Sequence, residues 1–329
     1  MKHVNVSLFV PHLGCPHTCI FCNQKTISGH TEPLKKEDII SACEIASKGE
    51  HSIEDSEIAF FGGSFTAIDR KDIIACLETA YPYVKTQFGG IRISTRPDCI
   101  NEEILSVLKK YGVTAIELGA QSMKKDILDK NERGHSPEDT FKAAELIKSF
   151  GFSLGLQMMT GLYGSTPEDD IYTAECFIKI KPDTVRIYPT VVLENTKLSE
   201  LYKSGEYAPY GFDETVKLCA RLLKMFYDEN IKVIRLGLHS GGNVEEGYVA
   251  GVYHPAFREL CEALIYREEA EKLLFSLPKG RYELLVPKGA ISKMTGQKKS
   301  NINYFEDKGY FLTVRESDEL EGYRVKTHI

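Results

Sequence analysis

The sequence lacks the features that mark several classes of protein. No apolar run approaches the roughly 18 residues that span a membrane, and the first residues have neither the charged nor the apolar region of a signal peptide. There is no low-complexity segment and no basic excess, because 41 Lys and Arg stand against 47 Asp and Glu, a net charge of -6. These absences predict a cytoplasmic globular protein, and they exclude nucleic-acid binding by bulk charge alone.

A disulfide framework is not expected either. The chain has nine cysteines, an odd number, in 329 residues, which is too long for a disulfide scaffold. Six of them are scattered, most within apolar helical patterns, and we interpret them as small buried hydrophobes. These six are Cys43, Cys76, Cys99, Cys176, Cys219 and Cys261. The other three, Cys15, Cys19 and Cys22, lie together directly after the apolar run at residues 6–10.

From residue 4 to about residue 240, short β-rich runs alternate with stretches of helical periodicity. The predicted strands are 4–10, 57–61, 91–95, 115–118, 153–159, 184–188 and 232–236. The predicted helices between them are 35–48, 71–86, 102–111, 138–150, 167–179 and 213–228. Because each parallel connection needs a crossover, this alternation predicts an α/β fold, a partial TIM-type (β/α) barrel with its chemistry on the loops after the strands.

The last part of the chain has a different pattern. A long helix at 254–277 precedes a strand at 282–286, a helix at 289–295 and strands at 310–315 and 323–326. We predict a barrel domain of residues 1–265 and a small α+β C-terminal extension of residues 266–329.

A local basic stretch lies in this extension between Lys279 and Lys299, where six basic residues occur with the single acid Glu283. The six are Lys279, Arg281, Lys288, Lys293, Lys298 and Lys299, with Tyr282, Asn301, Asn303, Tyr304 and Phe305 nearby. Such a mixture suits looped or single-stranded RNA, whose bases stack and whose phosphates contact cations. A solvated helical face is the simpler explanation of the same lysines.

The three clustered cysteines have the spacing of a metal site. Cys15, Cys19 and Cys22 form Cys-x3-Cys-x2-Cys on one loop, which suits zinc or an iron–sulfur cluster. Structural zinc takes four ligands, so His12 or His17 would have to complete the set. A [4Fe–4S] cluster held by three cysteines instead keeps one iron open to an external molecule.

This motif, with the aromatic Phe21 before its last cysteine, resembles that of the radical SAM superfamily. The resemblance implies that Cys15, Cys19 and Cys22 hold a [4Fe–4S] cluster whose open iron binds S-adenosylmethionine. Reductive cleavage then yields methionine and a 5′-deoxyadenosyl radical, with a flavodoxin or ferredoxin as a suitable electron donor.

Further motifs resemble the SAM-binding motifs of the superfamily. Gly62 and Gly63, in Phe-Phe-Gly-Gly-Ser-Phe-Thr, imply a backbone cradle for the methionine ammonium, although a plain turn has the same composition. The remaining implied contacts are Gln121 with the ribose, Arg133 with the methionine carboxylate, Gln157 with SAM, and Tyr188 with adenine and substrate. Otherwise Arg133 would be a solvated loop residue and Tyr188 a core aromatic.

The chain is most similar to the radical SAM domain of the Elongator catalytic subunit, which modifies wobble uridine in tRNA. The similarity lies in residues 94–98, 118–122, 133–135, 158–162 and 186–190, and it extends from about residue 5 to 211, more loosely to 264. Two departures occur. Ser94 stands where related domains usually place an acid, and the stretch after residue 266 is shorter than the roughly 150 residues that an acetyltransferase domain needs.

The expected function is therefore reductive SAM cleavage for the modification of RNA or tRNA. Two alternatives remain open: a small-molecule or tetrapyrrole substrate, and a cluster-containing haem-binding protein without turnover. His239, after the last barrel strand, is a candidate proton donor or substrate ligand, although a lone histidine is more often structural.

Overall fold

The computed structural model describes residues 5–10, 18–23, 34–238 and 245–328. The predicted site residues Cys15 and His239 lie outside these ranges, as do His12 and His17. Among the described residues, no helix has the length and apolarity needed to cross a membrane.

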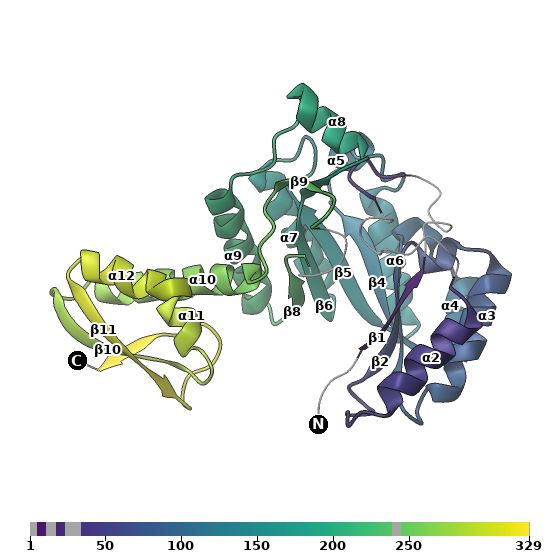
Figure 1. Cartoon of the computed structure of the whole chain (residues 1–329), viewed down its shortest axis with the longest axis horizontal. Helices are drawn as coiled ribbons and strands as arrows, with labels where there is room; N and C mark the ends of the chain where they lie inside the picture. Colours follow the sequence, from purple (N-terminus) through teal and green to yellow (C-terminus); the bar gives the residue numbers. More distant parts are fainter. Residues whose placement is uncertain (1–4, 11–17, 24–33, 239–244, 329) are drawn as a thin grey trace.

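Seven parallel strands form the curled half-barrel that the sequence predicts, in the order β1-β2-β3-β4-β5-β6-β8 (Figure 1). Their bounds are β1 Asn5–Val10, β2 Glu57–Gly62, β3 Gly90–Thr95, β4 Val113–Gln121, β5 Ser153–Thr160, β6 Thr184–Pro189 and β8 Lys232–Leu236. Each predicted barrel strand is therefore confirmed. The order follows the chain, because every strand is joined to its neighbour by a helical connection.

Helices pack along the outer side of this sheet. They are α2 Lys36–Ser47, α3 Arg70–Ala80, α4 Glu102–Lys110, α6 Pro137–Ser149, α7 Pro167–Ile180 and α9 Phe212–Asp228. Local sequence sets their starts: Ser136 caps α6 by accepting from the Asp139 amide, with Pro137 in the first turn. The predicted helix at 71–86 is shorter in the structure, because Pro82 lies in a 3₁₀ turn that follows α3.

The concave face of the half-barrel carries a ladder of charged side chains. Arg92 Nε lies 2.6 Å from Glu57 Oε2, and Arg92 Nη1 donates to Glu117 Oε1 at 3.2 Å. Arg186 on β6 also pairs with Glu117, with its Nε 2.6 Å from Oε2 and its Nη2 2.8 Å from Oε1. Burial alone lowers the pKa of Arg186, but Glu117 and Tyr188 raise it above its usual value.

A glycine makes room for this ladder. Glu117 on β4 and Arg186 on β6 are separated by β5, where Gly155 pairs with Glu117 in register. A Cβ at Gly155 would come within 2.8 Å of Glu117 Cγ and 3.0 Å of Thr184 Oγ1. The Glu117 side chain can cross β5 because Gly155 has no side chain.

Several short elements were not expected from the sequence. They are α5 Lys125–Lys130, α8 Lys197–Ser204, α12 Ser300–Asp307 and the antiparallel pair β7 Val191–Leu193 and β9 Tyr248–Gly251. Each is short and has few apolar repeats from which to detect a period. Together α8, β7 and β9 form a second small core against the cysteine motif.

The C-terminal extension begins on a continuous helix. The helix α10, Phe257–Leu274, runs across the predicted boundary at residue 265. It is followed by β10 Gly280–Pro287, α11 Ile291–Thr295, α12, β11 Tyr310–Ser317 and β12 Lys326–His328, with the sheet order β11-β10-β12. These elements confirm a small α+β extension.

The strand predicted at 323–326 is wrong, because only Lys326 of that range belongs to β12. Tyr323 is instead buried, with its ring 5.0 Å from that of Tyr227 and 5.5 Å from that of Tyr266. Tyr266 also donates from its hydroxyl to the Gly322 carbonyl at 2.6 Å. Aromatic packing therefore decides the path of this segment, which a period-two pattern cannot reveal.

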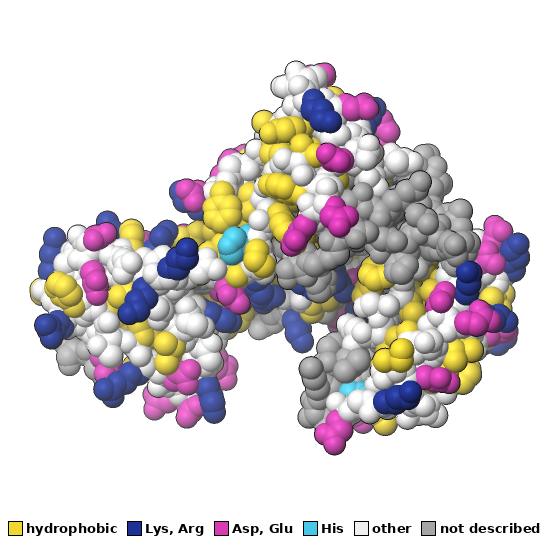
Figure 2. Space-filling model, viewed as in Figure 1, with side chains coloured by type: hydrophobic (Ala, Val, Ile, Leu, Met, Phe, Trp, Pro, Cys, Tyr) yellow, Lys and Arg dark blue, Asp and Glu magenta, His cyan; other side chains and the backbone are white. Residues whose placement is uncertain are grey.

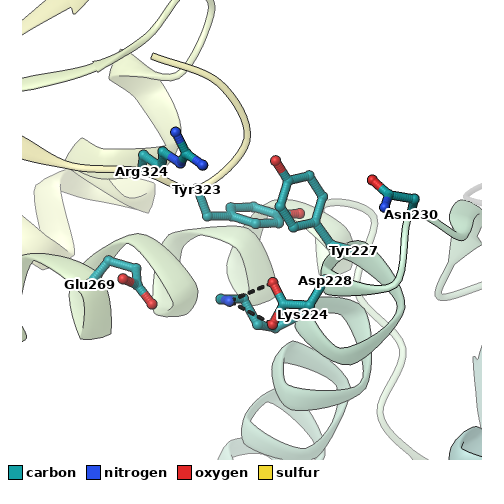
Figure 3. Close-up of a pocket in the computed structure, with 7 residues that line it drawn as sticks. All are labelled: Lys224, Tyr227, Asp228, Asn230, Glu269, Tyr323 and Arg324. Carbon is teal, nitrogen blue, oxygen red and sulfur yellow. Dashed lines mark hydrogen bonds and ion pairs between the residues drawn. The ribbon is translucent and has the colours of Figure 1, made fainter.

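A cavity of about 300 Å³ lies at the junction of the barrel and the extension (Figure 3). Its lining residues are Lys224, Tyr227, Asp228, Asn230, Glu269, Tyr323 and Arg324. Two cations and two acids balance each other there, and Lys224 is already paired with Asp228 at 2.7 Å. The cavity is therefore a polar seam between the two parts, without a charge excess to select a ligand.

Candidate functional site

The described part of the cysteine motif is a tight turn held by two distant segments. The Cys22 amide donates to the Cys19 carbonyl at 3.1 Å. The Ile20 amide donates to the Asn131 carbonyl, and the Ile20 carbonyl accepts from the Leu198 amide. Phe21 packs against the small core that contains Ile20. Among the described residues no group of three metal-ligating side chains occurs, since Cys15 lies outside them. The turn therefore fixes the positions of Cys19 and Cys22.

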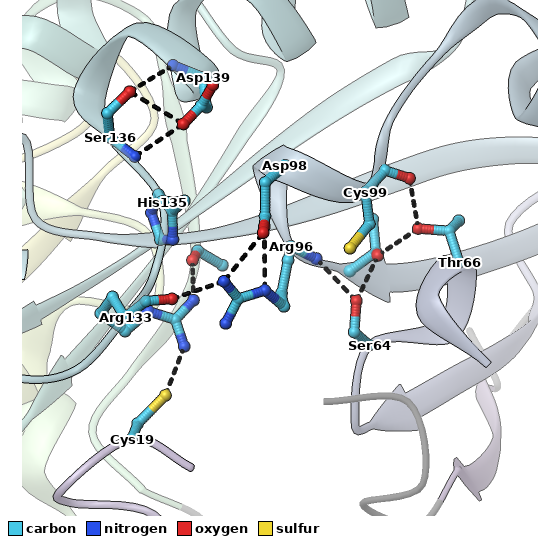
Figure 4. A network of polar contacts seen from close by, with 12 residues as sticks. Cys19, Ser64, Thr66, Arg96, Asp98, Cys99, Arg133, His135, Ser136 and Asp139 are labelled. Atoms are coloured by element: carbon cyan, nitrogen blue, oxygen red, sulfur yellow. Dashed lines mark hydrogen bonds and ion pairs between the residues drawn. The ribbon is translucent and has the colours of Figure 1, made fainter. Parts of the chain in front are cut away.

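Arg133 lies directly beside this turn (Figure 4). Its Nη1 donates to Cys19 Sγ at 3.0 Å and its Nη2 to the Gly119 carbonyl at 2.5 Å. Only 7% of Arg133 is exposed, and its Nε finds no hydrogen-bond partner among the described residues. Arg133 is thus a buried cation with spare donor capacity, not a solvated loop residue.

A second buried arginine supports the first. Arg96, 3% exposed, forms a bidentate pair with Asp98 at 2.9 and 3.0 Å and donates to the Arg133 carbonyl at 2.5 Å. Burial opposes the charge of Arg96, but the pairing with Asp98 raises its pKa above the usual value. Asp98 pairs with Arg96 alone, and Arg133 forms no ion pair with an acid among the described residues, so the site carries an excess of positive charge that favours an anionic group.

The glycine-rich loop after β2 is tied to the end of β1 and to the end of β3. Gly62 has φ +103°, and a Cβ there would come within 2.6 Å of the Val10 carbonyl oxygen, which accepts from the Gly63 amide at 2.8 Å. The hydroxyls of Ser64 and Thr66 lie 2.8 and 2.6 Å from that of Thr95. This hydrogen bonding gives the backbone at Gly62 and Gly63 a fixed shape.

Gln121 occupies a strained position at the end of β4. The register of β4 against β5 shifts between Gly119 and Gln121, and Gln121 has φ +67°, which is uncommon for a residue with a side chain. Its Oε1 accepts from Gln157 Nε2 on β5 at 3.2 Å. A Cβ at Gly119 would lie 2.9 Å from Gln121 Nε2. The bulge thus brings the two amides together beside Arg133.

Two other sequence candidates lie farther along the strand ends. Tyr188 is half-buried on β6, two residues beyond Arg186 and therefore on the same concave face. Ser94 is paired in register with Glu117, and it is half-buried. The strand ends therefore bring Arg133, Gln121 and Gln157 into one cluster with Cys19, whereas Tyr188 makes no hydrogen bond with these four residues in the described part of the chain.

His135 is neutral in this site. Burial, together with the nearby charges of Arg133 and Arg96, lowers its pKa to about 4. Its Nε2 lies 3.2 Å from the Ala120 carbonyl, so this nitrogen carries the proton and Nδ1 is an unprotonated acceptor. Nδ1 has no partner among the described residues.

Sequence reasoning assigned no role to Arg96, Asp98 or His135. The Arg-x-Asp spacing of residues 96–98 was a signal, since it allows a bidentate pair across a single 3₁₀ turn. The link from Arg96 to Arg133 spans 37 residues, so no local pattern could reveal it.

The comparisons with known proteins agree with this geometry. Residues 9–176 match the radical SAM superfamily, and residues 182–267 match the radical SAM C-terminal domain. A tRNA uridine(34) acetyltransferase of Methanocaldococcus infernus is 32% identical over 257 residues, 65% of this chain and 48% of the relative. Human Elongator complex protein 3 is 34% identical over 196 residues, 53% of this chain and 36% of the relative. The chain thus spans about half or less of the length of these relatives.

Among solved structures, the archaeal Methanocaldococcus infernus Elp3 with an N-terminal deletion has the same fold. The two chains superpose with a TM-score of 0.63 and 24% identity, covering 83% of this chain and 63% of the other. The superfamily match covers more than half of the chain, including the cysteine motif, the glycine-rich loop and Arg133. This chain therefore belongs to the radical SAM superfamily.

Proposed function

We propose that this radical SAM enzyme modifies tRNA. The cofactors of the family are a [4Fe–4S] cluster and S-adenosylmethionine, which together supply a 5′-deoxyadenosyl radical that abstracts hydrogen. The observation that carries the proposal is the convergence of Cys19, Arg133, Gln121 and Gln157 at the ends of the barrel strands. Family resemblance and strand-end geometry agree on the same residues.

The residues present fit these cofactors. Cys19 and Cys22 provide soft sulfur ligands on one turn, and Cys15 is the proposed third ligand. Buried nitrogens of Arg96 and Arg133 have no partner among the described residues, as expected where an anionic ligand belongs. The tight cradle at Gly62 excludes a Cβ. Donor chemistry, spare hydrogen-bond capacity and backbone access thus all match.

Each proposed SAM contact follows from one of these features. Arg133 attracts the methionine carboxylate, and its Nη1 holds Cys19 in place. Backbone groups at Gly62 and Gly63 receive the ammonium. Gln121 and Gln157 present linked amides to the ribose hydroxyls, while Tyr188 and Phe21 offer aromatic surface to adenine and to the cluster.

The tRNA substrate is the finer part of the proposal. It is supported by relatives that are named for tRNA uridine(34) and for Elongator, although these relatives are longer than this chain. A small molecule or tetrapyrrole as substrate, and haem binding without turnover, are the competing functions. The basic stretch between Lys279 and Lys299 favours RNA over both.

The test is anaerobic purification followed by incubation with SAM and dithionite, with and without a tRNA transcript. We expect brown protein, release of 5′-deoxyadenosine, and faster release with tRNA than with coproporphyrinogen or no addition. Colourless protein with stoichiometric zinc would contradict the cluster. Cleavage unaffected by tRNA would contradict the substrate, and haem binding without SAM cleavage would support the binding protein. Mass spectrometry of RNA nucleosides from cells with and without the gene then identifies the product.

A further inference from the structure

The three-stranded C-terminal sheet has one covered face and one open face. On β10, Leu284 and Val286 point into the core, against which the helices of the extension pack. The residues that alternate with them along β10 lie on the opposite face, as do their partners in register on β11 and β12. We define the open sheet face by Arg281, Glu283 and Leu285 on β10, Phe311, Thr313 and Arg315 on β11, and Lys326 on β12.

Phe311 is the most unusual member of the open sheet face. It is 52% exposed, although it lies in a regular strand pair, at the second position of the register between β10 and β11. Its ring makes no aromatic contact with another described residue. Single exposed hydrophobic residues are common on protein surfaces, so Phe311 alone indicates nothing. Its cross-strand neighbour, however, is Arg281, which is also exposed.

The charges of the open sheet face do not balance. Arg281, Arg315 and Lys326 are positive, and Glu283 is the single acid. Arg315 uses that acid in an exposed pair, with Nε 2.8 Å from Glu283 Oε2. Arg281 and Lys326 make no ion pair with any described residue. Arg281 and Lys326 are therefore uncompensated cations on either side of the Arg315–Glu283 ion pair. The ring of Phe311 lies at one end of the face.

Several residues of the predicted basic stretch, and of the aromatic and amide residues near it, are paired or buried in the structure. Lys293 is paired with the buried Glu262 at 2.9 Å, and Phe305 is fully buried. Asn301 donates to two backbone carbonyls, and Tyr304 lies against the guanidinium of Arg267. In Figure 2 the basic side chains of the extension, at the left, are interspersed with acidic ones. The rings of Tyr282 and of the half-exposed Phe275 pack against that of Tyr310. Phe311, which was not named from the sequence, is exposed and its ring contacts no other ring or cation among the described residues.

We infer that the open sheet face binds single-stranded or looped RNA, with a base stacked on Phe311 and phosphates on Arg281 and Lys326. This inference rests on the proposed tRNA substrate and names the surface that holds it. An exposed ring on a sheet, flanked by cations, matches the chemistry of an unpaired nucleotide. A second copy of this chain fits less well, because a two-fold contact would place the like charges of two such faces against each other.

The test measures binding of a fluorescein-labelled oligouridylate and a tRNA transcript by fluorescence anisotropy. Phe311→Leu keeps the apolar volume but removes the aromatic face, and we expect about 5- to 100-fold weaker oligouridylate binding. Phe311→Tyr retains a ring and should bind nearly as the wild type does. The double variant Arg281→Gln, Lys326→Gln should lower the slope of log K against log salt by about 1.4, since each lost phosphate contact contributes about 0.7.

Matched control variants lie on the barrel. Phe141→Leu changes another exposed phenylalanine, and Lys71→Gln changes an exposed lysine, and neither should alter binding. Unchanged binding by both Phe311→Leu and the double variant overturns the surface, even if tRNA still stimulates release of 5′-deoxyadenosine. A variant that changes the sedimenting mass would identify a contact between copies and also overturn it. If the wild type binds neither the oligouridylate nor the tRNA transcript, the proposed tRNA substrate is itself wrong.

Discussion

Arg133 donates a hydrogen bond to the sulfur of Cys19 at 3.0 Å, across 114 residues of sequence. The same guanidinium donates to the Gly119 carbonyl on β4. The cysteine turn is thus linked to the barrel strand next to the proposed SAM pocket. A residue inferred to bind SAM also holds a proposed ligand of the cluster.

This double contact leads to a prediction for Arg133→Lys. An ammonium is a point charge and cannot donate in fixed directions to Cys19 and Gly119 while also meeting a carboxylate. We expect the cluster absorbance to persist while the Kd for SAM, measured by calorimetry, rises about 10- to 100-fold. Arg221→Lys, on the exposed side of α9, serves as the control. SAM binding that equals the wild type would refute the assigned contact.

The cysteines divide into proposed ligands and others. Cys19→Ser and Cys22→Ser should each abolish the brown colour, the bound iron and SAM cleavage, because a hydroxyl is a poor substitute for a thiolate on iron. Cys99→Ser is the matched control, since Cys99 is half-buried near the same polar network but outside the motif. Its iron content should equal that of the wild type. Iron retained by Cys19→Ser would contradict the assignment.

Gly155→Ala tests the charged ladder of the barrel. The new methyl group would displace Glu117, whose carboxylate meets both Arg92 and Arg186. We expect the free energy of unfolding in urea to fall by about 1–3 kcal/mol, as for other overpacked sites. At Gly49 an added Cβ meets only the Ala46 oxygen, at 3.6 Å, so Gly49→Ala should change little. Equal stability of the two variants would mean that the ladder shifts freely.

The burial of Asp170 predicts that the stability of the protein depends on pH. It is 2% exposed in the first turn of α7, where it accepts from the Gly161 amide and the Ser165 hydroxyl of the loop after β5. Burial raises its pKa to about 7, from 3.8, despite these hydrogen bonds. Between about pH 4 and pH 7 the folded protein therefore keeps a proton that the unfolded chain releases. The free energy of unfolding that this carboxyl contributes is lost as pH rises through that range.

The measurement is urea unfolding of the wild type and Asp170→Asn across this range. The stability of the wild type relative to the variant should decline as pH rises. Asp213→Asn, at an exposed position in the first turn of α9, should show no such trend. A difference between wild type and Asp170→Asn that is constant with pH would show that Asp170 does not change its ionisation in this range.

Much of the barrel could be predicted because its signals are local. The run at residues 184–188 alternates in burial along one strand, and helix starts such as Ser136 and Thr166 lie within the motif that defines them. The strand expected at 323–326 failed because Tyr323 is held by rings from α9 and α10. Short elements such as α8 depend on the same kind of distant packing.

The sequence by itself determined the spacing of the three cysteines, the glycine-rich turn and the order of the barrel strands, since each depends on neighbouring residues and on a repeated period. Only the tertiary structure decided that Arg133 contacts Cys19, that Glu117 reaches Arg186 across Gly155, and that Phe311 rather than Phe305 is exposed. These relationships join residues on different elements. They depend on strand register and on how helices cover the sheets, and no local pattern encodes either.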